Sequence, residues 1–192
     1  MDKARQLFGL EFDCTHRPYI LDPSLTMETQ DKVTYLVGRL GGNPASLDGM
    51  IAVCQQMFVK AGLPTLKRDG LTGSTFDSHR LLLYALTLPG AEETQHKLLH
   101  ALFTQYFHHG RSMSERDALM AAAADVGIDT EQAGAILNSD AFRSEVRTAI
   151  AEAAADGVRS VPYFRIGNQK GFSGGDSDFL AIFKKIAAAP IC

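Results

Sequence analysis

The cysteines are the residues with the clearest capacity for chemistry. Thiol–disulfide exchange needs a thiolate of lowered pKa at a helix N-terminus and a second cysteine that resolves the mixed disulfide. Cys14 is expected in a strand, Cys54 on the apolar face of a helix, and Cys192 is the last residue. Buried cysteines at such positions act as small hydrophobic residues. No two of the three form a Cys-x-x-Cys, so we identify no catalytic residue and predict no dithiol exchange by these 192 residues.

The histidines do not predict a metal site. His96 and His100 are four residues apart on one expected helix, so their imidazoles can meet. Zinc needs two more protein ligands, or one and a water, and no cysteine or carboxylate lies at a matching spacing. His108 and His109 end the same helix, where an imidazolium suits the helix dipole. We therefore interpret all four as surface residues and expect no metal.

Composition limits the classes of partner. A chain of 192 residues that is 45% hydrophobic can form one domain, or one domain with a large insertion. Its formal net charge of −3 gives no general attraction to nucleic acid or anionic membranes, and neither partner is expected. No apolar run approaches the roughly 18 residues needed to cross a bilayer. The first residues lack the apolar block of a signal peptide, so a cytoplasmic location is expected if Met1 is the true start.

Hydrophobic periodicity and turn residues predict a strand, seven helices, a hairpin and a last helix. The strand covers 10–14 and continues to 21. The helices cover 28–40, 43–62, 76–88, 92–109, 114–127, a short segment from 129, and 140–156; the hairpin pairs 161–166 with 171–173, and the last helix covers 176–188. One strand and one hairpin do not share a sheet without another strand between them.

The C-terminal part of this pattern resembles a known family. Gly157–Phe164 (Gly-Val-Arg-Ser-Val-Pro-Tyr-Phe), followed by Phe172-Ser-Gly-Gly, resembles the C-terminal half of the DsbA-like thioredoxin fold. Gly70–Leu82, the Phe103-x-x-Tyr-Phe pattern and Arg17–Pro23 are similar to its FrnE-like branch. Relatives of that branch include 2-hydroxychromene-2-carboxylate isomerases and kappa-class glutathione transferases.

The resemblance implies an α/β, thioredoxin-like (DsbA-like) fold with a large all-helical insertion. Residues 1–26 and 157–192 would form the thioredoxin-like unit, and residues 27–156 the insertion. The family's first strand and Cys-x-x-Cys would precede Asp2, so that Lys3–Phe8 would be the tail of the first helix. Two completions of the sheet remain open: a start upstream of Met1, which we favour, or a strand from a second copy in a homodimer.

The resemblance also implies a binding site. Pro162 would be cis, and Ser160, Val161 and Pro162 would bind the substrate, with the backbone edge of Val161 pairing with an extended peptide or with glutathione. Ser74, His79 and Arg80 would line the cleft. His79 also lies on the stripe of Phe76, Leu83 and Leu86, so a role as a core histidine remains open.

Three functions fit these observations. The first is a DsbA/FrnE-like thiol–disulfide oxidoreductase or isomerase acting on protein thiols or disulfides, with a low-pKa cysteine that attacks and a partner that resolves. The second is a glutathione-dependent isomerase or transferase of the chromene-carboxylate or kappa type. The third is a non-catalytic binding module that keeps the cleft. No cofactor is expected beyond glutathione as a cosubstrate.

Overall fold

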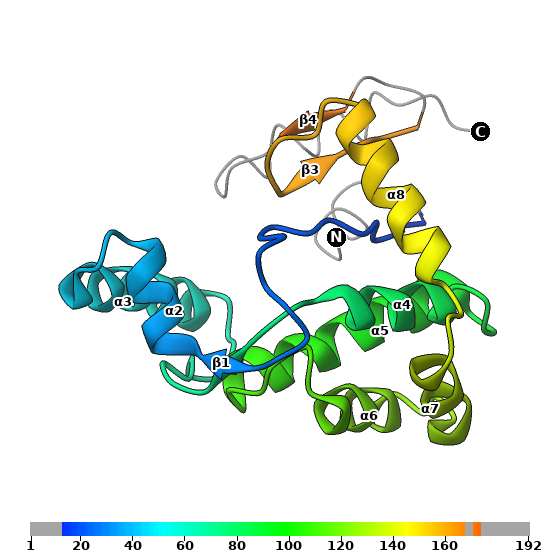
Figure 1. Cartoon of the computed structure of the whole chain (residues 1–192), viewed down its shortest axis with the longest axis horizontal. Helices are drawn as coiled ribbons and strands as arrows, with labels where there is room; N and C mark the ends of the chain where they lie inside the picture. The colour runs from blue at the N-terminus through cyan, green and yellow to red at the C-terminus, as the bar shows by residue number, and fades with distance from the viewer. Residues whose placement is uncertain (1–12, 168–170, 174–192) are drawn as a thin grey trace. The chain divides into compact units, whose positions relative to one another are not determined.

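The computed structural model describes residues 13–167 and 171–173. The chain divides into two compact units (Figure 1): residues 22–147 form one, and residues 1–21 with 148–192 form the other. The sequence placed the corresponding boundaries at 26 and 156. Because α8 crosses the boundary at Thr148, the two units are joined through one continuous helix as well as through the chain at Leu21.

The larger unit is helical, as predicted. Side-chain caps and left-handed glycines set the helix ends: Asp31, Asn43 and Asp129 each accept a hydrogen bond from the first turn of the helix that follows. The helices are α2 (Lys32–Arg39), α3 (Pro44–Lys60), α4 (Phe76–Ala85), α5 (Ala91–Phe103), the π-helix η1 (Thr104–His108), α6 (Arg116–Asp125), α7 (Thr130–Asn138) and α8 (Arg143–Ala155).

The core of this unit lies among α4, α5, α6 and α7. Leucines on α4 and α5 share one buried cluster with alanines on α6 and α7. The buried members of the core include Leu81, Leu82, Ala85, Leu98, Leu102, Ala118, Leu119, Ala122 and Ala133. One buried polar side chain, Gln95, donates to the carbonyl oxygen of Leu82 at 3.1 Å and so ties α5 to α4.

The helix predicted over 92–109 changes its winding near its end. After Phe103 the chain continues as a π-helix, and the His109 amide donates to the Thr104 carbonyl at 3.1 Å. The π-turn accompanies a run of aromatic contacts, in which the Phe107 ring lies edge-on to Phe103, Tyr106 and Phe58 at centroid distances of 5.7, 5.1 and 5.7 Å. Such single π-turns cannot be distinguished from ordinary helix by hydrophobic periodicity alone.

A short ladder in this unit was not predicted. Strand β1 (Gln30–Asp31) pairs antiparallel with β2 (Leu71–Thr72). Gly70 lies against Gly110 beside this ladder, and a Cβ at Gly70 would lie 2.1 Å from the Gly110 carbonyl oxygen. Gly70 also has a φ of 121°, so this close approach requires glycine.

The smaller unit contains a hairpin of β3 (Tyr163–Phe164) and β4 (Phe172–Ser173), shorter than the predicted 161–166 but in the expected place. The strand predicted from 10 to 21 is wrong over its described part, because residues 13–21 form no strand. Pro18 has no N–H to give a ladder, and Arg17 instead forms an ion pair with Glu152 of α8 at 2.6 Å. The helix predicted over 176–188 and Cys192 lie outside the described residues.

Candidate functional site

The loop that precedes β3 carries the predicted substrate-binding residues. Helix α8 ends at Ala155, and Gly157, with a φ of 76°, closes the turn that follows it; the Val158 amide donates to the Ala153 carbonyl at 3.0 Å. The chain then passes through Ser160, Val161 and Pro162, all exposed, with 46% of Val161 accessible to solvent. The Val161–Pro162 peptide bond is cis, the form that the resemblance implied.

The hairpin behind this loop is held by its own side chains. Phe164 and Phe172 are directly opposed and their rings stack at 5.7 Å with an interplanar angle of 28°. The Tyr163 ring lies over Gly171, where a Cβ would be 2.2 Å from the tyrosine oxygen. Any side chain at Gly171 therefore forces Tyr163 to move, and Tyr163 directly follows Pro162.

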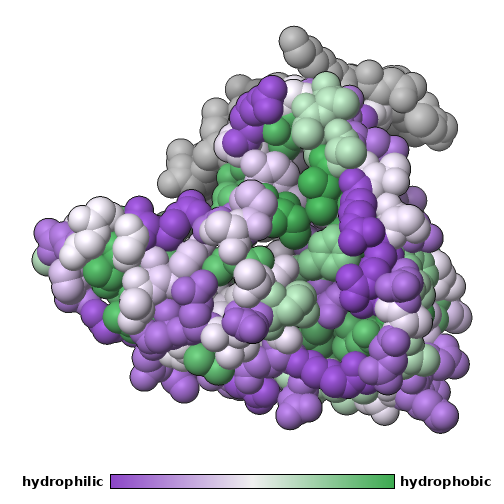
Figure 2. Space-filling view, in the orientation of Figure 1, coloured by the Kyte–Doolittle hydropathy of each residue, from purple (hydrophilic) through white to green (hydrophobic). Residues whose placement is uncertain are grey.

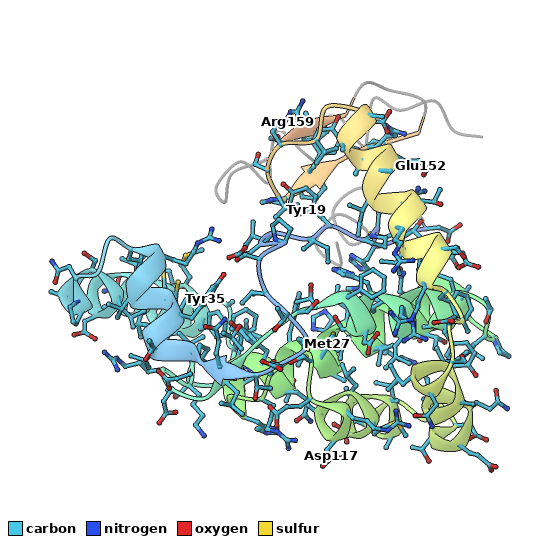
Figure 3. All side chains as sticks on the ribbon, in the orientation of Figure 1. Tyr19, Met27, Tyr35, Asp117, Glu152 and Arg159 are labelled. Carbon is cyan, nitrogen blue, oxygen red and sulfur yellow. The ribbon has the colours of Figure 1, made fainter. Side chains whose placement is uncertain are left out.

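Polar side chains connect the loop to its surroundings. The hydroxyl oxygens of Ser160 and Ser173 are 3.4 Å apart, which joins the loop to the far strand of the hairpin. Arg165 donates to Asp156 at 2.6 Å, which ties the end of β3 to the residue after α8. Figure 3 labels Glu152 on α8 and Arg159 on the loop just after it. The loop therefore has fixed ends and an exposed middle.

The predicted cleft residues Ser74 and His79 lie in the larger unit. Ser74 is half-buried; its amide donates to the Thr26 carbonyl at 2.8 Å, and its hydroxyl oxygen accepts from the Phe76 amide at 3.2 Å, as a residue before a helix does. His79 is half-buried on α4. The structure thus assigns Ser74 a local role at the start of α4.

Arg80 is fully buried, with 0% of its surface exposed. Its guanidinium donates to Asp77 at 2.8 Å, and to the main-chain carbonyls of Ala141 at 2.9 Å, Ser139 at 2.6 Å and Ile136. These bonds use the planar fork of donors to join α4 to the connection between α7 and α8. This placement gives Arg80 a structural role in place of the cleft-lining role expected from the sequence.

Two further polar clusters were not predicted. The Asp22 carboxylate accepts from the Ser24 hydroxyl at 2.6 Å, from the Tyr35 hydroxyl at 2.8 Å and from Arg39 at 2.6 Å, and these bonds, that of Ser24 first, hold the pKa of Asp22 far below its ordinary value. Lys32 is buried, and its ammonium donates to the Lys67 carbonyl at 3.1 Å. Burial lowers the pKa of Lys32.

The remaining candidates for chemistry are not residues of the loop. Cys14 and Cys54 are half-buried, and neither is in a disulfide. His96 and His100 approach to 4.6 Å between ring centroids and border a shallow depression of about 610 Å³. Among the described residues, no group of three or more histidine, cysteine or acidic side chains is arranged to hold a metal ion. No described helix has both the length and the apolar character to span a membrane.

Comparison with known proteins identifies the family. The model of the DSBA-like thioredoxin domain matches residues 1–182, so the chain belongs to this family. A solved structure, the probable DsbA oxidoreductase from Streptomyces coelicolor, is 28% identical, with a TM-score of 0.81 over 100% of this chain and 84% of that one. No curated protein matches the chain. The predicted fold class is confirmed: a DsbA-like thioredoxin fold that is mostly helical, consistent with α/β and a helical insertion.

Proposed function

We propose that this chain acts in thiol–disulfide chemistry as a FrnE-like member of its family, and that it binds an extended polypeptide at Ser160, Val161 and Pro162. The observation that carries the proposal is the exposed loop that leads directly into the β3–β4 hairpin. An extended peptide binds such an edge through main-chain hydrogen bonds, with side-chain contacts adding selectivity. Membership of the family and the likeness to a probable DsbA oxidoreductase support the class of reaction.

The loop has the groups that such binding needs. The Val161 side chain offers an apolar contact, and the Ser160 hydroxyl can donate to a peptide carbonyl while remaining near Ser173. The stacked pair Phe164 and Phe172 gives the hairpin a firm base, so little conformational entropy is lost when the peptide binds.

The thiols of the described residues do not supply the exchange itself. The sequence contains no Cys-x-x-Cys, and both described thiols are half-buried outside the loop. We therefore propose that these 192 residues bind the polypeptide but do not reduce or isomerise disulfides by themselves. In an insulin-reduction assay with a dithiol reductant, we expect the rate with the protein to equal the rate without it.

The binding step is tested by titrating the ¹⁵N-labelled protein with an unstructured, cysteine-free peptide and following amide chemical shifts. We expect shifts centred on residues 158–164, and we expect Val161→Asp to weaken binding at least tenfold. Leu21→Asp is the matched control, because Leu21 is an exposed apolar residue (68%) of the same unit outside the loop. Equal effects of the two substitutions, or shifts that avoid the loop, would show that the loop is not the peptide site.

The glutathione-dependent alternative uses the same edge, because glutathione also binds in an extended form through its backbone. The same titration therefore distinguishes the glutathione-dependent function from polypeptide binding. Saturable shifts at residues 158–164 with reduced glutathione, and none with the peptide, would favour the isomerase or transferase function. Binding of the peptide without catalysis by any longer form of the protein would favour the binding module.

A further inference from the structure

Arg159 gives the loop before β3 a positive charge that none of the described residues neutralises. It lies two residues before Val161, is exposed, and makes no hydrogen bond or ion pair with any residue of the described ranges. Figure 3 labels it on the loop that follows α8. A guanidinium presents a planar fork of N–H donors that matches the two oxygens of a carboxylate. The loop therefore carries a group suited to an anion close to its exposed apolar residue.

The acidic side chains that are close to this loop in the sequence already have partners. Asp156 accepts from Arg165 at 2.6 Å, which is an ion pair between the end of α8 and the end of β3. Glu152, on the last turns of α8, accepts from Arg17 at 2.6 Å. Because both carboxylates are paired with other arginines, the guanidinium of Arg159 is left for a ligand.

The main chain of the loop offers donors as well. The amides of Gly157 and Val158 donate to carbonyls in the last turn of α8 at 3.1 and 3.0 Å, which offsets the partial negative charge of the helix end. The amides of residues 159–161, in contrast, donate to no residue that the structure describes. The hydroxyl of Ser160 is 3.4 Å from that of Ser173, at the long end of the hydrogen-bond range. Several donors of the loop can thus turn to a bound acceptor.

The surface around the loop is neither wholly polar nor wholly apolar. Figure 2 shows hydrophilic residues beside hydrophobic ones on the described part of the smaller unit. In the loop itself, charged Arg159 and 46%-exposed Val161 are separated by a single residue. Two residues of extended chain span roughly 7 Å, so one short segment of a bound polypeptide can contact both side chains.

We propose that the polypeptide bound at Ser160, Val161 and Pro162 is acidic, and that Arg159 binds one of its carboxylate side chains. This inference rests on the proposed function, because the same loop must hold the polypeptide. The guanidinium pairs with the carboxylate, while Val161 contacts an apolar residue about two positions away along the peptide. Arg159 therefore determines which polypeptides bind, in addition to the main-chain pairing that any extended polypeptide can make.

The exposure of Arg159 sets the size of the preference. An ion pair between exposed groups changes an equilibrium constant by at most roughly fivefold. Salt screens such a pair, with a screening length of roughly 10 Å at 0.1 M and 3 Å at 1 M. We expect a carboxylate in the peptide to strengthen binding about threefold to fivefold at about 20 mM salt, and less than about twofold at about 0.5 M.

The test uses two end-blocked, cysteine-free peptides in the amide titration of the ¹⁵N-labelled protein. Their cores are Asp-Ser-Val-Ser-Asp and Asn-Ser-Val-Ser-Asn, which place the variable residue two positions from valine on either side, whichever direction the peptide runs. Arg159→Gln should remove the preference for the aspartate peptide and leave the affinity for the asparagine peptide unchanged. Arg159→Lys keeps the charge and should retain part of the preference.

The matched control is Arg147→Gln, which removes the same charge from α8. Arg147 is exposed, and its guanidinium lies over the Phe76 ring at 5.9 Å. It is roughly 12 Å from the end of α8 along the helix axis, which exceeds the screening length at 0.1 M salt. At this salt concentration we expect Arg147→Gln to keep the full preference for the aspartate peptide.

The outcomes separate this inference from the polypeptide site itself. Equal affinities of the two peptides, with shifts at residues 158–164, would overturn the acidic preference and leave the polypeptide site. A preference that survives Arg159→Gln would also overturn it, because another group would then bind the carboxylate. No shifts at the loop with either peptide would overturn the proposed function and this inference together. Binding of reduced glutathione alone, weakened by Arg159→Gln, would assign the guanidinium to a glutathione carboxylate and overturn the polypeptide as its ligand.

Discussion

Replacing Arg80 by methionine tests whether this buried guanidinium holds the larger unit together. Methionine keeps the apolar stem and a similar length but has no donor. The substitution leaves the carbonyls of Ile136, Ser139 and Ala141 without their bonds to Arg80, and leaves Asp77 without its cation. Since Arg80 is fully buried, water cannot replace these bonds without opening the packing between α4 and the α7–α8 connection.

The expected loss of stability follows from these missing bonds. An unsatisfied buried polar group costs roughly 1–3 kcal/mol, and removing one partner of a buried ion pair costs roughly 3–5 kcal/mol. Asp77 is 16% exposed and can regain some hydration, which reduces its part of the cost. We expect Arg80→Met to lower the free energy of unfolding by about 3–5 kcal/mol.

The assay is urea unfolding, with hydrogen exchange of the amides of α4, α6 and α7 to assign the loss to the larger unit. Lys97→Ala is the control, because Lys97 pairs with Glu93 on the surface of α5 and such pairs contribute well under about 1 kcal/mol. A loss below about 1 kcal/mol for Arg80→Met would refute the structural role, and a loss of peptide binding at unchanged stability would restore the cleft-lining role.

Three further predictions concern two closely packed glycines and the Asp22 carboxylate. Gly70→Ala should lower the free energy of unfolding by about 2–4 kcal/mol in urea titrations, since its Cβ meets the Gly110 carbonyl at 2.1 Å and its φ is 121°. The pKa of Asp22 in the folded protein lies below its ordinary 3.8. The carboxylate therefore contributes fully to the free energy of unfolding above that pH, and the contribution is lost as the pH falls further. With Asp22→Asn, the free energy of unfolding should change less with pH below about 4. Gly171→Ala should displace Tyr163 and weaken peptide binding about tenfold at unchanged Tm, measured by the amide titration.

The helices were predictable because their signals are local. Asn43 with Pro44 and Asp129 with Thr130 mark helix starts, and left-handed Gly157 marks a stop, so the helix order and most boundaries agree with the structure. The hairpin was predictable for a similar reason: its β-rich residues flank a glycine turn within a dozen residues.

The rest depends on pairings that are distant in sequence. Arg80 donates to carbonyls 56–61 residues away in the sequence. Any helix of this unit could have offered such carbonyls, so the residue type and position of Arg80 did not reveal that its side chain is buried. The β1–β2 ladder joins two-residue segments that carry no strand pattern of their own. The strand expected over 10–21 depended on alternation alone, and residues 13–21 form no strand, because alternation does not supply the neighbouring strand that a ladder needs.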